Sequence, residues 1–236
     1  MEKETQGKIN KKGINPDVDV ASFDDKDTIN KPLNAFEIFN KCIKRANNLI
    51  AIPSKIPKRN NTEEHNCDCY RAAIVLSISA LDAFIKKIVI SEIFNQLTRD
   101  NNISSPLREY VKQLLNQDKL LDAARQSNFN DILEKEINED FEKKSFQGEW
   151  KIETYMKMIG HDNIFSEVCM KCNINEKNFR KSIEIFTQRR HIIAHSGDFD
   201  LNRSPFVENK IEKNDAINCV NTVTTFAKTI NEIIEN

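Results

Sequence analysis

The feature that most constrains the fold is an apolar segment inside a long helical pattern that runs from about Cys67 to Leu97. Between Ala72 and Ile85 nearly every side chain is apolar, so the predicted helix is apolar on all sides. In a water-soluble protein such a helix is covered by neighbours all round. The longest uncharged apolar stretch stops at Asp82 and is too short to span a bilayer. We therefore expect a central buried helix, with an arginine or a hydroxyl group facing the carboxylate of Asp82.

Three further segments carry apolar residues at three- and four-residue steps: 34–50, 176–194 and 214–234. Turn-forming residues are few, with 5 Gly and 6 Pro in 236 residues, which favours helices over a many-stranded sheet. Gly197 is suited to end the second of these helices. The prediction is an all-α bundle of four main helices.

The rest of the chain divides by composition. Residues 1–32 hold few large apolar side chains and read as a disordered tail before a helical domain at 33–236. Residues 51–65 read as a polar loop. Residues 103–170 are expected to form a helical insertion, in which Pro106 opens one helix. Its remaining predicted features are a helix from Phe129 to Phe141 and core contacts from Trp150, Ile152, Tyr155 and Met156.

Charge and cysteine usage limit the function classes. Lys and Arg number 35 against 36 Asp and Glu, so nucleic-acid binding would have to rest on local clusters rather than on net charge. The first ten residues are charged and polar and show no signal peptide. We expect a cytoplasmic protein with six reduced cysteines and no cofactor.

The segment from Thr187 to Asp198 holds two of the four histidines near the end of a predicted helix. Helical geometry places His191 and His195 about 40° apart on one face and about 6 Å apart along the axis. Arg190 lies about 140° round the axis from His195, and its long side chain can reach the same region. RNA cleavage needs a base for the 2′-hydroxyl, an acid for the leaving 5′-oxygen and positive charge at the phosphate. Histidine and arginine supply these functions.

Other interpretations of these residues remain open. An Arg and a His near a helix C-terminus often only compensate the helix dipole. The His-x-x-x-His spacing also suits a metal ion, although no third ligand is adjacent. Zinc could also lie between two cysteine clusters, which are His65-x-Cys67-x-Cys69 and Cys169-x-x-Cys172.

Two segments together resemble one family. The run RRHIIAHSGD, from Arg189 to Asp198, resembles the R-polar-x-x-x-H signature of the HEPN superfamily in its RiboL-PSP-like branch. The run RAAIVLSISALDAFI, from Arg71 to Ile85, is similar to the long helix of that branch. Both occur in the expected order, about a hundred residues apart.

This resemblance implies a helical bundle, a homodimer with a composite site, and metal-independent endoribonuclease activity that leaves a 2′,3′-cyclic phosphate. It also implies a role as a toxin or antiphage-defence effector, with RNA as substrate and an antitoxin or sensor protein as a partner. The alternative is a non-catalytic HEPN module that binds a partner protein or a nucleotide.

Carried onto this chain, the resemblance makes Arg190 the phosphate-stabilising residue and His195 the catalytic histidine. His191 fills the polar position, where Asn is commoner, and either joins proton transfer or orients the phosphate. Arg189 and Asp82 are expected to support the site. Asp82 either pairs with Arg190 across the core, or caps or ion-pairs within the insertion.

Basic residues precede the motif along the same helix. Arg180 and Lys181 are candidate contacts for the RNA backbone. The alternative is a solvated helix face, because Glu176 and Glu184 lie among them.

Overall fold

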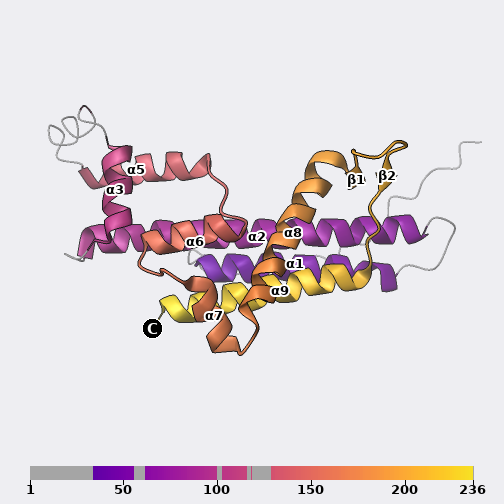
Figure 1. Cartoon of the computed structure of the whole chain (residues 1–236). Coiled ribbons are helices and arrows are strands. Elements are labelled where there is room, and N and C mark those ends of the chain that lie inside the picture. The colour runs from indigo at the N-terminus through magenta and orange to yellow at the C-terminus, as the bar shows by residue number, and fades with distance from the viewer. Residues whose placement is uncertain (1–33, 56–61, 100–102, 116–117, 119–128, 236) are drawn as a thin grey trace, which may run out of the picture. The chain divides into compact units, whose positions relative to one another are not determined.

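The computed structural model describes residues 34–55, 62–99, 103–115, 118 and 129–235. These residues belong to the unit Leu33–Asn236, and the predicted tail at 1–32 lies outside them. Within the described part the fold is all-α, as predicted, with eight α-helices and one two-stranded hairpin (Figure 1). None of the described helices combines the length and the apolar character that a membrane span requires.

The elements follow one another as α1 (Ala35–Ala51), the 3₁₀ helix η1 (Ile52–Ser54), α2 (Thr62–Arg99), α3 (Ser105–Leu114), α5 (Phe129–Glu142), α6 (Glu149–Met158), α7 (Ile164–Cys172), α8 (Glu176–Ser196), β1 (Phe199–Asp200), β2 (Val207–Glu208) and α9 (Lys213–Ile234). The four predicted main helices correspond to α1, α2, α8 and α9. The predicted loop at 51–65 is wrong at both ends, because Ala51 belongs to α1, Ile52–Ser54 form η1 and α2 already begins at Thr62. Residues 56–61 of this predicted loop lie outside the described residues. Glu63 and Glu64 stabilise the first turn of α2 through the helix dipole.

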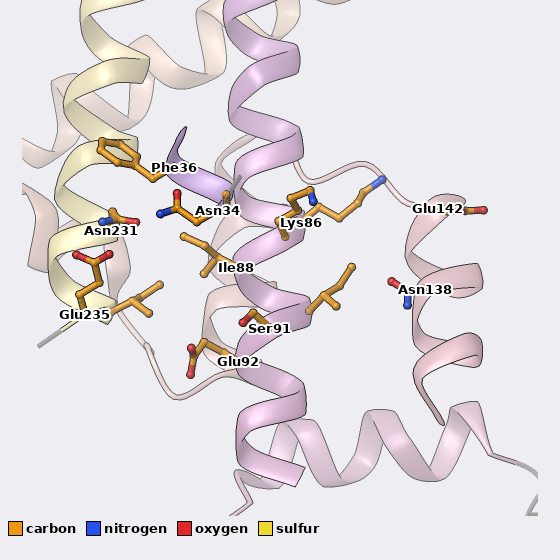
Figure 2. Close-up of a pocket in the computed structure, with 14 residues that line it drawn as sticks. Asn34, Phe36, Lys86, Ile88, Ser91, Glu92, Asn138, Glu142, Asn231 and Glu235 are labelled. Atoms are coloured by element: carbon orange, nitrogen blue, oxygen red, sulfur yellow. The ribbon is translucent and has the colours of Figure 1, made fainter. Parts of the chain in front are cut away.

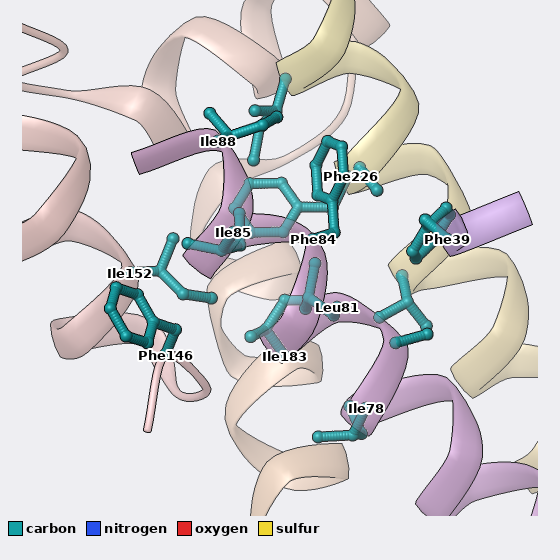
Figure 3. Close-up of a cluster of buried hydrophobic side chains, with 14 of the residues drawn as sticks. Phe39, Ile78, Leu81, Phe84, Ile85, Ile88, Phe146, Ile152, Ile183 and Phe226 are labelled. Atoms are coloured by element: carbon teal, nitrogen blue, oxygen red, sulfur yellow. The ribbon is translucent and has the colours of Figure 1, made fainter. Parts of the chain in front are cut away.

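Helix α2 is the central helix, as its apolar sequence predicted. It contacts α1, α5, α6, α8 and α9 (Figure 1). Figure 3 shows the centre of the core, where Leu81 and Phe84 of α2 lie among side chains of α1, α8 and α9. Leu81 is fully buried. Burial on this scale is the main favourable term in folding.

Replacement of Leu81 by Ala should therefore destabilise the fold by about 3 kcal/mol, because it removes apolar contacts and leaves a cavity in a core that cannot fully close. The free energy of unfolding from urea titration, followed by circular dichroism, measures the effect. Met170→Ala is the control, since Met170 of α7 is 72% exposed. Equal midpoints for the two variants would contradict the central position of α2.

The helices of the predicted insertion pack through an aromatic cluster. Phe141 of α5 contacts the rings of Tyr110, Phe146 and Tyr155, at centroid distances of 5.0 to 5.7 Å. Pro106 stands in the first turn of α3, and α5 covers the predicted helix at 129–141, so both predictions are confirmed.

The predicted core residues of α6 are only partly correct. Ile152 and Met156 are fully buried, and Tyr155 is partly buried. The prediction that Trp150 packs onto the core is wrong, because its side chain is 75% exposed. Residues that are two positions apart in a helix point in directions about 200° apart, so burial of Ile152 turns Trp150 towards solvent.

Candidate active site

The end of α8 fixes where the predicted catalytic residues lie. The helix begins after Asn175, whose side chain accepts a hydrogen bond from the backbone N–H of Asn178 at 3.0 Å. It ends at Gly197, which has a φ of 60° in the left-handed region that glycine adopts without strain. Arg190, His191 and His195 therefore stand in the last turns of a regular helix.

His191 and His195 lie together as the helical spacing predicted. Their ring centroids are 4.3 Å apart, and the ring planes meet at 43°. Both side chains are exposed to solvent. An exposed imidazole pair is accessible to a bound molecule, and imidazole can take up or release a proton near neutral pH.

Arg190 is a partly buried cation with no ion pair among the described residues. Its guanidinium forms no hydrogen bond or salt bridge with any residue that the structure describes, and its Nε is buried without a partner there. Its side chain and that of His191 line one cavity of about 540 Å³. The positive charge at this site is therefore open to an anion from outside.

The neighbouring Arg189 has a different environment. It donates hydrogen bonds to Asp198 at 2.7 Å and to the backbone carbonyls of Asn209 and Lys210. Asp198 has no exposed surface and also accepts a hydrogen bond from Arg71 of α2 at 2.8 Å. This cluster of Arg71, Arg189 and Asp198 ties the chain after α8 back to the central helix.

Arg71 is held firmly in its charged form. Burial alone would lower its pKa, but the hydrogen bond with Asp198 and the charges of Glu208 and Asp198 outweigh burial and raise it. Sequence reasoning did not assign a role to Arg71 or Asp198, although both lie in the two family-like segments. One sequence signal pointed to such a pair: Arg71 lies in a helix predicted to be buried, and a buried arginine needs an acidic partner.

The contacts of Asp82 decide between its two predicted roles, which were pairing with Arg190 and capping or ion-pairing within the insertion. Its Oδ1 accepts hydrogen bonds from the backbone N–H of Phe146 and from the Ser145 hydroxyl at 3.3 Å. The pairing of Asp82 with Arg190 is wrong, because the segment before α6 occupies the carboxylate. The expected hydroxyl partner is present as Ser145.

Arg180 forms salt bridges with three glutamates, so its guanidinium is not free to contact RNA. It forms salt bridges at 2.8 Å with Glu149, Glu153 and Glu176, and the hydrogen bond with Glu153 raises its pKa most. Lys181 is exposed, but it stands nine positions before Arg190, about 180° round α8. We include neither residue in the site.

The cysteine clusters do not meet. Cys67 contacts the carbonyl of Ile211 just before α9, whereas Cys172 contacts Thr229 near the other end of that helix. These points are separated by roughly 24 Å of helix. Burial raises the pKa of Cys219 to about 12, so this thiol is unreactive. No group of three or more His, Cys, Asp or Glu side chains in the described ranges is placed to hold a metal ion.

A second cavity, of about 610 Å³, lies among α1, α2, α5 and α9 (Figure 2). Its lining combines Lys86 and Lys87 with acids such as Glu92 and Glu142, and it contains neither His191 nor His195. Figure 2 shows apolar side chains such as Ile88 beside these charges. The mixed lining lacks histidine, the usual group for acid–base catalysis near neutral pH, so the end of α8 is the stronger candidate site.

Residues 40–236 match the family model described as RiboL-PSP-HEPN, which covers most of the chain. The chain belongs to this family. The resemblance seen in the two sequence segments is thereby confirmed, and the chain is a HEPN-type module, a class that includes many ribonucleases. No curated protein and no solved structure matches the chain.

Proposed function

We propose that this HEPN protein is a metal-independent endoribonuclease whose active site is completed by a second copy of the chain. The observation that carries the proposal is the exposed pair of His191 and His195 beside Arg190, whose guanidinium has no ion pair among the described residues. The three groups match the three needs of RNA cleavage.

The reaction proceeds by transfer within the RNA strand. One histidine takes the proton from a 2′-hydroxyl, and the 2′-oxygen attacks the adjacent phosphorus. Arg190 stabilises the negative charge that develops on the phosphoryl oxygens. A second, protonated histidine gives its proton to the leaving 5′-oxygen. The products are a 2′,3′-cyclic phosphate and a free 5′-hydroxyl.

One chain cannot easily supply both proton donor and acceptor. In an in-line displacement the attacking and leaving oxygens lie on opposite sides of phosphorus. His191 and His195 lie on one face of α8 with ring centroids 4.3 Å apart, so they reach the same side of a bound phosphate. A two-fold dimer presents an identical pair from the other side.

Exposed apolar side chains on α8 and on the hairpin that follows it support this dimer. Ile192 is 36% exposed on α8, and Phe199, Leu201, Phe206 and Val207 are exposed on and beside the β1–β2 hairpin. The strands pair antiparallel, with Phe199 opposite Glu208, and β1 begins three residues after α8 ends at Ser196. Contiguous exposed apolar groups mark protein interfaces. A second copy that covers them would bring its own His195 close to the first.

Phe206→Lys should break this dimer, because it places a charge where an apolar side chain, 65% exposed in one chain, meets its partner. We expect dimer dissociation to become about 30-fold more favourable, which corresponds to loss of about 2 kcal/mol from an aromatic contact. Sedimentation equilibrium measures the change. Met170→Lys is the control, since Met170 is exposed to a similar degree on α7. A Phe206→Lys dimer as tight as the control dimer would exclude this interface.

Cleavage of a labelled RNA in the presence of a chelator tests the proposed activity. We expect internal cuts whose 5′ fragments end in a 2′,3′-cyclic phosphate, as read by mass spectrometry. An activity that requires added metal ions, or products with a 5′-phosphate, would overturn the mechanism. Binding of RNA without cuts would favour the non-catalytic alternative.

We further propose that the protein acts as a toxin or defence effector in the cytoplasm, restrained by an antitoxin or sensor protein. An unrestrained ribonuclease depletes cellular RNA, so its expression alone should slow growth. Normal growth during expression of the active enzyme would contradict this role.

A further inference from the structure

The cavity beside His191 has features that cleavage alone does not use. It lies between α8 and the segment that leads into α6, and it has a volume of about 540 Å³. Arg190 and His191 line one side, and Gln147 and Lys151 line the other. His191 lines the cavity and its ring lies 4.3 Å from that of His195, so the cavity borders the proposed cleavage site.

The cavity is positively charged. Lys151 and Arg190 both face it, whereas no carboxylate residue contributes to its lining. Within the described ranges Lys151 has no ion pair. Two cations without ion pairs among the described residues favour an anionic ligand, and the Gln147 amide adds hydrogen-bonding capacity, whereas the Gln188 amide already donates to Glu184 at 2.9 Å.

Two buried polar atoms at this cavity have no protein partner among the described residues. The hydroxyl oxygen of Thr187 and the Nε of Arg190 are buried and form no hydrogen bond with that part of the chain. Buried polar groups in folded proteins are almost always paired. Groups left unpaired at a cavity wall are therefore suited to a bound ligand.

The wall opposite α8 is fixed in place. Asp82 holds the backbone N–H of Phe146 and the hydroxyl of Ser145. Gly148 has a φ of 92°, and a Cβ atom at this position would lie in ordinary van der Waals contact, 3.7 to 3.8 Å from side-chain atoms of Glu184 and Thr187, so the backbone here packs directly beside α8. A pre-formed wall lowers the entropic cost of binding.

We propose that this cavity binds a backbone phosphate of the RNA strand, one that neighbours the phosphate under attack. The inference rests on the proposed ribonuclease function, since it places the cavity along the same strand. Lys151 neutralises this phosphate, Arg190 lies between it and the phosphate under attack, and the Thr187 hydroxyl completes its hydrogen bonds. The Gln147 amide then contacts the sugar or base without strict sequence choice.

Affinity for a short RNA in which every 2′-hydroxyl is methylated tests the cavity without any cleavage. Lys151→Gln should weaken binding about tenfold at low salt, because one charge-assisted contact is lost. The slope of log Kd against log salt concentration should fall by about 0.7, the value for one phosphate contact on a single strand. Fluorescence anisotropy of the labelled oligonucleotide measures both quantities.

Lys157→Gln is the matched control. Lys157 stands on the same helix and makes only an exposed ion pair with Asp162 at 3.6 Å, outside this cavity. It should keep the wild-type affinity and salt slope. If Lys151→Gln behaves like this control, the phosphate site is excluded, whether or not the protein cleaves RNA. If the wild-type protein binds and Lys151→Gln does not, while neither cuts unmethylated RNA, the site stands and the proposed catalysis fails.

Thr187→Val provides a second test that leaves the shape of α8 almost unchanged. It replaces the hydroxyl by a methyl group of similar size and changes no charge, so we expect a several-fold loss of oligonucleotide affinity with the same salt slope as wild type. Unchanged affinity would remove Thr187 from the site. Inorganic phosphate at matched ionic strength should compete poorly, because the strand offers several contacts at once; equal competition would indicate a site for free phosphate.

Discussion

His195→Ala should lower RNA cleavage by about a thousandfold, because loss of one proton-transfer group costs a factor of this order. The effect should appear in the rate at saturating RNA, since an exposed histidine contributes little to binding. Single-turnover cleavage of a labelled RNA with excess enzyme measures this rate directly.

His65→Ala is the matched control for that loss. His65 is exposed in the first turns of α2, and no contact of its side chain is part of the site. It should cleave at the wild-type rate. Equal rates for His195→Ala and His65→Ala would remove the imidazole from the mechanism.

Asp198→Ala should destabilise the folded chain by about 3 kcal/mol, because Arg189 loses its acid partner while Arg71 loses the buried one of three and keeps Asp68 and Glu208. Arg71 is almost fully buried, so water cannot replace the lost carboxylate. For a chain of this length the melting temperature should fall by roughly 10 °C. Urea titration at 222 nm gives the free energy of unfolding.

Asp162→Ala is the matched control, because it removes an exposed carboxylate where Asp198→Ala removes a buried one. Asp162 is 68% exposed and its ion pair with Lys157 spans 3.6 Å, so its removal should cost less than about 1 kcal/mol. The same unfolding midpoint for Asp198→Ala and Asp162→Ala would show that the buried cluster does not stabilise the end of α8.

The sequence predicted the long helices well because their evidence is periodic. The apolar surface of α2 and the amphipathic stripe of α8 repeat over many turns, and each repeat supports the same assignment. The β1–β2 hairpin was not predicted, since strands of two residues carry no alternation. The prediction for Trp150 fails because it rests on the apolar character of the side chain and neglects its angle on α6 relative to Ile152.

The candidate site was predictable where it is local and not where it depends on long-range pairing. The 4.3 Å pair of His191 and His195 follows from a helical spacing of four. The contact between Arg71 and Asp198 joins residues that are 127 positions apart, so no local pattern reports it.

The neighbouring arginines illustrate the same limit. Arg189 and Arg190 are identical in sequence terms, yet the first binds Asp198 and the second faces a cavity. A rotation of about 100° around α8 separates these two environments. The sequence alone gives the angle between the two arginines around the helix, but not which residues surround each of them.

The most direct test of the composite site is the specific activity of the enzyme across a range of protein concentrations, with the dimer fraction determined in the same samples by sedimentation. If two chains build one active site, cleavage per chain rises in proportion to the dimer fraction and falls to background in dilute monomer. Constant specific activity from monomer to dimer would contradict the shared site.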